Sequence, residues 1–295
     1  MPSLLRRVKT KLAIHAHRKV RGLLDGEYTS VFHGRTIEFD DLRPYVAGDE
    51  PRDIDWKATA RHGSPLVRRY IAARKHTVLL LVDTGRNMAA LAASGETKSE
   101  IAIFAAGVTG YLALKHGDRV ALVAGNAEHS TFHRPSSTEA HLERLLQSID
   151  TETTLDAPRS DLTAQLGFVA KAFPKRMILL VVADDRELGE AEAQLLRRLS
   201  VQHEILWLTI GDADLLHTEW TGSPMHDVAT TSSLPSFLRS NKKLKADFDR
   251  SVAERTKRND ELFTRLAISS QRLASSAGVV PGIIRLLEVH RHARR

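Results

Sequence analysis

The sequence contains no cysteine among its 295 residues. Disulfide bonds, thiol catalysis and zinc–thiolate sites are therefore excluded. No stretch reaches the roughly 18 consecutive apolar residues of a membrane-spanning helix. The first residues also lack the uninterrupted apolar stretch of a signal peptide. We therefore expect a cytoplasmic protein without a transmembrane segment.

Two motifs of catalysis are also missing. The sequence has no Gly-x-x-x-x-Gly-Lys-Ser/Thr loop, which cradles phosphate groups, and no Gly-x-Ser-x-Gly turn, which exposes a nucleophilic serine. The first absence argues against ATP hydrolysis through a phosphate loop, and we expect a protein that is not an enzyme.

Acidic residues are absent from the first part of the chain, which is strongly basic. Residues 1–24 hold seven of the 43 Lys and Arg residues, so 36 basic and 36 acidic residues balance in the remainder. That balance does not favour a nucleic-acid partner. Helical spacing of apolar residues predicts an amphipathic basic helix over residues 1–26, with a stripe formed by Leu5, Val8, Leu12, Ala16 and Val20. We expect this helix to pack on the body or on a partner; the alternative is a membrane-surface or nucleic-acid binder.

Apolar runs alternating with helical patterns dominate the rest of the sequence. Strands are predicted at residues 66–70, 78–82, 119–124, 129–133, 177–183, 204–210 and, weakly, 227–230. Helices are predicted at 98–116, 137–149, 161–172, 190–199, within 237–276, and after Pro281. Alternating strands and helices predict a doubly wound, mostly parallel α/β sheet. We divide the chain into a basic helix, a segment packed on the main domain, the α/β domain and a C-terminal helical extension, at residues 1–26, 27–76, 77–240 and 241–295.

A denser pattern of typed residues precedes the strand at 78–82. Residues 31–70 read VFHGRTIEFDDLRPYVAGDEPRDIDWKATARHGSPLVRRY. The characteristic positions are Glu38, Phe39, Leu42, Arg43, Tyr45, Gly48, Asp49, Arg52, Ile54, Asp55, Trp56, Ala60 and Arg61. This pattern resembles the bacterial domain-of-unknown-function 58 family, and the resemblance extends over roughly residues 28–240.

The resemblance implies a von Willebrand factor A-like fold and a link with MoxR-type AAA+ ATPases. On this basis we expect a protein-interaction module that acts as an adaptor or substrate-recruiting partner of such an ATPase. The sequence does not identify the client protein.

The von Willebrand A fold often carries a metal-ion-dependent adhesion site, in which Asp-x-Ser-x-Ser and two later loops supply oxygen ligands to Mg²⁺. The matching residues here are Asp83, Asn87, Ser160 or Asp161, and Asp184 or Asp185. Because Gly85 offers no ligand and Asn87 replaces a hydroxyl, the resemblance implies a degenerate site with no cofactor or weakly bound Mg²⁺. We expect Ser at positions 85 and 87 to strengthen binding. In the structural alternative, Asp83 caps a turn and Ser160 or Asp161 caps a helix.

A second acidic group lies in the segment GDEPRDIDWKATAR. One hypothesis is a metal-dependent hydrolase that uses Asp49, Asp53 and Asp55. The interpretation we favour is structural: Arg52 and Arg61 pair with acids in this loop, and Trp56 anchors it against the sheet.

Overall fold

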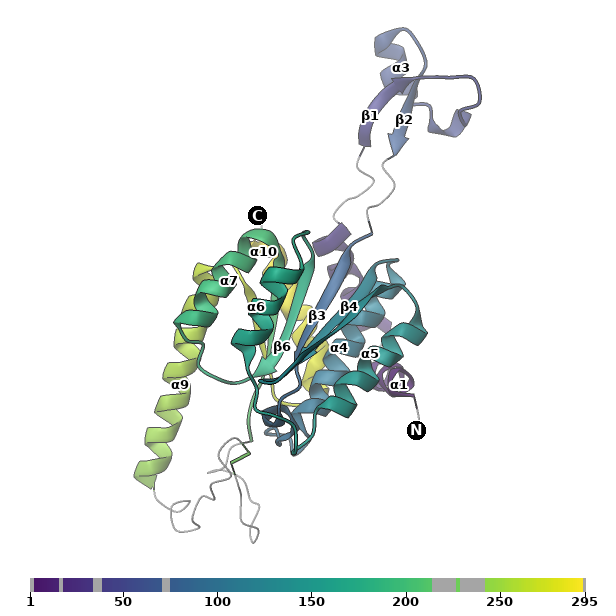
Figure 1. Ribbon diagram of the computed structural model, residues 1–295. Helices are drawn as coiled ribbons and strands as arrows, with labels where there is room; N and C mark the ends of the chain where they lie inside the picture. The colour runs from purple at the N-terminus through teal and green to yellow at the C-terminus, as the bar shows by residue number, and fades with distance from the viewer. Residues whose placement is uncertain are drawn as a thin grey trace.

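The protein is built around one six-stranded sheet flanked by helices (Figure 1). The structure, a computed structural model, describes residues 3–15, 18–33, 39–70, 75–213, 227–228 and 242–293. The strand order is β5-β4-β3-β6-β7-β8. The strands are β3 Thr77–Asp83, β4 Arg119–Gly125, β5 Ser130–Ser136, β6 Ile178–Asp184, β7 Glu204–Ile210 and β8 Ser269–Leu273. Only β5 is antiparallel to its neighbour, so the predicted doubly wound, mostly parallel fold is confirmed.

The apolar runs are buried strands because helices cover both faces of the sheet. Alternate residues of β3 point to opposite sides: Leu80 belongs to one core cluster and Leu79 to the other. The first cluster lies under α1 Leu4–His15, α2 Arg18–Tyr28, α4 Lys98–Lys115, α5 Glu139–Glu152 and α10 Val279–Ala293. The second lies under α6 Leu162–Ala172, α7 Glu190–Gln202 and α9 Lys242–Arg265. In the part of the chain that the structure describes, no helix combines the length and apolarity needed to cross a membrane.

The two ends of the chain differ from the sequence prediction in detail. The N-terminal helical segment consists of α1 and α2, followed by a short helical turn, Thr29–His33. Residues 269–273, predicted as helix, form β8, which pairs with β7 in parallel. A short helical turn, Ser276–Gly278, joins β8 to α10. The weak strand predicted at 227–230 falls mostly outside the described residues.

A small separate unit is inserted between α2 and β3. It contains β1 Phe39–Pro44, a 3-10 turn Pro51–Asp53, α3 Trp56–His62 and β2 Leu66–Tyr70, with β1 and β2 antiparallel. Figure 1 shows this β1–α3–β2 unit apart from the sheet. Both connections to the sheet domain, residues 34–38 and 71–74, lie outside the described part of the chain.

Candidate functional site

Acidic side chains gather at the carboxyl edge of the sheet, where ligands bind in many open α/β folds. Asp83 ends β3, Asp184 ends β6, and Asp212 lies two residues beyond β7. Asn87, in the turn after β3, donates from Nδ2 to Asp184 Oδ2 at 3.2 Å. Side chains from two neighbouring strands thus meet at one edge, as the strand positions predicted.

Asp83 is buried and caps the turn that follows β3. Its Oδ1 accepts a hydrogen bond from Gly85 N at 2.8 Å. Burial raises the pKa of Asp83 to about 6, because a carboxylate loses hydration in the interior. The turn leads into the 3-10 helix Arg86–Ala89. This is the structural role that the sequence allowed for Asp83.

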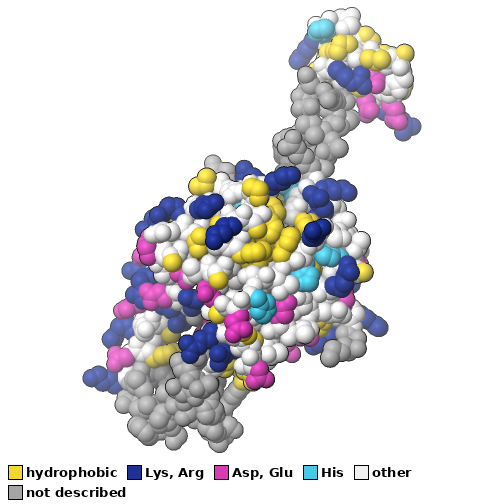
Figure 2. Space-filling model, viewed as in Figure 1, with side chains coloured by type: hydrophobic (Ala, Val, Ile, Leu, Met, Phe, Trp, Pro, Cys, Tyr) yellow, Lys and Arg dark blue, Asp and Glu magenta, His cyan; other side chains and the backbone are white. Residues whose placement is uncertain are grey.

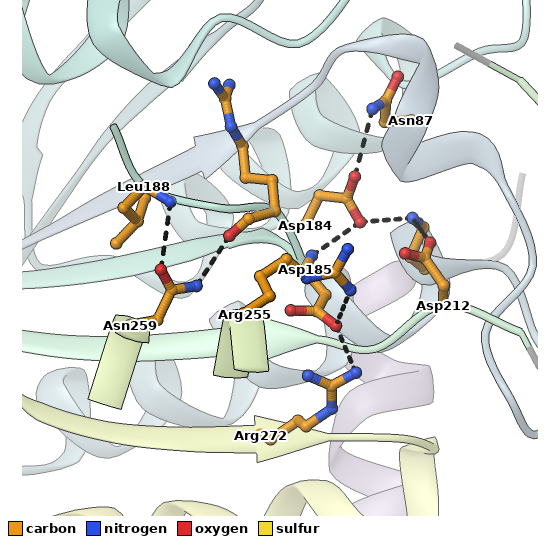
Figure 3. A network of polar contacts seen from close by, with 10 residues as sticks. Asn87, Asp184, Asp185, Leu188, Asp212, Arg255, Asn259 and Arg272 are labelled. Atoms are coloured by element: carbon orange, nitrogen blue, oxygen red, sulfur yellow. Dashed lines mark hydrogen bonds and ion pairs between the residues drawn. The ribbon is translucent and has the colours of Figure 1, made fainter. Parts of the chain in front are cut away.

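Lys98 supplies positive charge at this edge of the sheet, although the sequence did not identify it as a site residue. Its Nζ donates to Asp184 Oδ1 at 2.6 Å and to Asp212 Oδ1 at 2.5 Å, and its side chain is 1% exposed. Figure 3 shows Asn87, Asp184 and Asp212 drawn together in this network. Burial alone would lower the pKa of Lys98, but the two carboxylates outweigh burial and raise it. The ammonium group is therefore charged and held between two strand ends.

Two arginine side chains neutralise the neighbouring acid, Asp185 (Figure 3). Arg255 of α9 reaches its Oδ2 at 2.7 Å, and Arg272 of β8 also pairs with it. Asn259 of α9 accepts from Leu188 N and donates to the carbonyl of Arg186. These contacts hold α9 and β8 against the end of β6.

The donor set does not fit a Mg²⁺ site of the adhesion type. A Cβ on Gly85 would lie 2.4 Å from Ser160 N. The Ser160 loop therefore occupies the space that a serine side chain at position 85 would need. Asn87 turns its amide nitrogen toward Asp184, and Asp184 is committed to Lys98. Asp161 caps α6 by accepting from Ala164 N at 2.9 Å. Among the described residues, no group of three or more His, Cys, Asp or Glu is arranged to hold a metal.

Two buried oxygens nearby have no hydrogen-bond partner among the described residues: Thr84 Oγ1 and Asn87 Oδ1. Both are neutral, and ordered water satisfies such groups in many proteins. The crowding at Gly85 argues against our expectation that Ser at positions 85 and 87 would improve a cation site, which stays a prediction for a binding titration. A larger residue at position 85 has no room unless the loop of Ser160 moves.

One position in this network could have been found in the sequence. Asp212 follows a buried strand, as Asp83 and Asp184 follow theirs, so the same rule applied to it. Lys98 gave no such signal, because a lysine in the first turn of a helix usually faces solvent.

The family-signature residues do not join this edge. Arg43 makes two hydrogen bonds to Asp49, at 2.7 and 2.5 Å, and Asp49 also accepts from Val46 N. Asp55 caps α3 by accepting from Lys57 N and Ala58 N, both at 3.0 Å. Gly48 adopts a φ of +112°, which favours glycine. Asp49 and Asp55, two of the three acids of the hydrolase hypothesis, therefore stabilise the β1–α3–β2 unit. Glu38 of the signature lies outside the described residues.

Two details of the structural interpretation were wrong. Trp56 is 67% exposed and so does not anchor the loop against the sheet. Asp49 forms its ion pair with Arg43, and not with Arg52 or Arg61. Arg52 lies in the 3-10 turn and Arg61 in the last turn of α3. Sequence pattern identified the segment but not the direction of its side chains.

The basic N-terminal helix is docked on the sheet domain. Leu5, Val8 and Leu12 are buried in the first core cluster, and Val8 sits over Gly107 of α4, where a Cβ would lie 2.7 Å from its Cγ2. Glu143 of α5 accepts from Leu4 N at 2.9 Å and Leu5 N at 2.7 Å. The prediction that this helix packs on the body is therefore confirmed.

Comparison with known proteins places the chain in a family. Residues 41–258 match the family described as "Protein of unknown function DUF58". Uncharacterized proteins of Mycobacterium bovis and Mycobacterium tuberculosis are 27% identical over 213 residues, which make up 72% of this chain and 66% of each relative. The match thus spans slightly less than two thirds of those relatives.

Solved structures with some similarity include two bacterial proteins. A von Willebrand factor type A protein from Catenulispora acidiphila is 13% identical, covers 73% of this chain and 42% of its own, and has a TM-score of 0.40. An aerotolerance-related membrane protein from Bacteroides fragilis is 13% identical, covers 72% of this chain and 98% of its own, and has a TM-score of 0.41. Because the family match includes well over half of the residues, the chain belongs to the DUF58 family.

Proposed function

We propose that this protein is a non-enzymatic, cytoplasmic interaction module that binds a MoxR-type AAA+ ATPase through the β1–α3–β2 unit. The observation that carries the proposal is the exposure of three large hydrophobic side chains on that unit. Tyr45 is 40% exposed, Val46 61% and Trp56 67%. Figure 2 shows hydrophobic side chains gathered on this unit, away from the body of the protein.

Some signature residues stabilise the unit and others are exposed to solvent, and this difference supports a binding role. Arg43, Asp49 and Asp55 are engaged in local contacts that shape the unit. Tyr45 and Trp56 belong to the same signature but are left in solvent. Trp and Tyr are enriched among residues that dominate the energy of protein interfaces, and exposed apolar side chains that form a contiguous patch mark interaction sites.

The identity of the partner comes from the family resemblance. A chain without a phosphate loop of its own suits the role of an adaptor that delivers clients to an AAA+ ATPase. The client protein would bind elsewhere on the chain, and the carboxyl edge of the sheet is one surface available to it.

A titration of the purified ATPase from the same genome tests the proposal. Trp56→Ala should weaken binding roughly tenfold or more, as for a central aromatic contact. Val201→Ala is the matched control, because Val201 is 89% exposed on α7 of the sheet domain and should bind like wild type. Equal affinity of wild type and Trp56→Ala, or no binding of wild type, would contradict the proposal.

A further inference from the structure

Lys98 occupies an unusual position for a lysine. It is the first residue of α4, directly after the N-cap Thr97, whose side chain accepts from Glu100 N. The N-terminus of a helix carries partial positive charge, which disfavours a cation there. Burial of the ammonium adds a further cost. A lysine that is disfavoured both by the helix N-terminus and by burial needs a compensating interaction.

That compensation is the pair of carboxylates at the ends of β6 and β7. Asp184 is 7% exposed, so it needs a counter-charge as much as Lys98 does, whereas Asp212 keeps 48% of its side chain exposed. The loop before α4 is also tied to Asp212 by a β-bridge from Ala92, and Ala213 N donates to Leu91 O at 3.0 Å. Lys98 thus joins α4, β6 and the chain after β7 at one point.

We propose that the ammonium group of Lys98 supplies the positive charge that balances the acids at this sheet edge, as a divalent metal does in adhesion sites of the related fold. Asp184 accepts from Lys98 and Asp185 N through Oδ1 and from Asn87 through Oδ2, so the ammonium group already supplies the counter-charge that a metal would bring. This edge of the sheet then keeps its structure without a bound metal. This inference concerns a site inside one chain and does not depend on the proposed partner.

Thermal unfolding of the full-length chain tests the inference first without any variant. After treatment with EDTA, millimolar MgCl₂, CaCl₂ or MnCl₂ should leave the midpoint of unfolding unchanged, and Mn²⁺ should remain free by electron paramagnetic resonance. A rise in the midpoint with any of these ions, or bound Mn²⁺ in the wild type, would overturn the inference. This measurement remains decisive even if substitutions at Lys98 prevent folding.

Substitution then tests the role of the charge. Lys98→Met keeps most of the volume and should lower the midpoint by roughly 10 °C, because Asp184 becomes a buried unpaired carboxylate. Adding Asp184→Asn to that variant should recover at least half of the loss. Lys115→Met is the matched control: its ammonium pairs with Asp25 at the surface, is 51% exposed, and should matter little. No recovery in the double variant, or equal losses at Lys98 and Lys115, would show that the ammonium is not the counter-ion of Asp184.

Discussion

Replacing Trp56 by Ala should cost little stability, although buried tryptophans are among the most sensitive positions in proteins. A fully buried tryptophan removes about 150–250 Å² from water, which contributes about 4–6 kcal/mol at about 25 cal/mol per Å². Trp56 keeps 67% of its surface exposed, so about one third of that gain is realised. We therefore expect Trp56→Ala to lower the free energy of unfolding by about 1–2 kcal/mol at most.

Trp207 provides the internal comparison. It is 2% exposed in the core of β7, where its ring centroid lies 5.0 Å from that of Phe263. Trp207→Ala should cost about 3–5 kcal/mol, the usual range for a buried aromatic. Urea unfolding followed by far-UV circular dichroism measures both variants. An equal loss for Trp56→Ala and Trp207→Ala would refute the exposed position of Trp56, and with it the docking surface on the β1–α3–β2 unit.

Three other outcomes follow from the packing of the sheet domain. Gly85→Ser should destabilise the protein by about 1–3 kcal/mol through overpacking against Ser160; a stable variant that binds Mg²⁺ by calorimetry would show that the loops adapt. Partial burial would raise the pKa of Glu143, but donors from the start of α1 outweigh it and lower that pKa. Its anchoring of α1 is therefore present above the ordinary glutamate pKa and is lost as pH falls through the lower folded value. Hydrogen exchange of α1, corrected for intrinsic pH effects, should speed up in acid and in Glu143→Gln at neutral pH; unchanged protection would argue against this anchor. Because the apolar stripe of α1 is buried, anionic liposomes should bind the protein weakly and release it in moderate salt. Salt-resistant binding that disappears on deletion of residues 1–24 would favour the membrane alternative.

The central strands could be predicted from sequence because helices cover both of their faces. The run Val78–Val82 and the run at 204–210 are almost wholly apolar, and both proved to be strands. β8 escaped prediction because it is an edge strand with the sequence SSQRL, in which only the first and last residues are buried. Four polar residues in five give no strand signal, and the helical pattern before them continued through the segment.

The place of the candidate site was also predictable, but its chemistry was not. The rule that polar residues after buried strands meet at one edge located Asp83 and Asp184. It could not show that Lys98 turns inward from α4, since burial of a lysine depends on partners that are distant in sequence. In the same way, the signature segment was recognisable, but whether Trp56 packs on the sheet or faces solvent depends on where the β1–α3–β2 unit lies.

Site-specific photocrosslinking tests the central claim, that the β1–α3–β2 unit is the surface that binds the ATPase. A photoreactive phenylalanine analogue at Tyr45 lies on the exposed face of the unit, and the same analogue at Val201 lies on the sheet domain. With the MoxR-type ATPase present, the probe at Tyr45 should give a covalent product of the two chains, and the probe at Val201 should not. A product from Val201 alone, or none from either position in a mixture that binds by titration, would contradict the account.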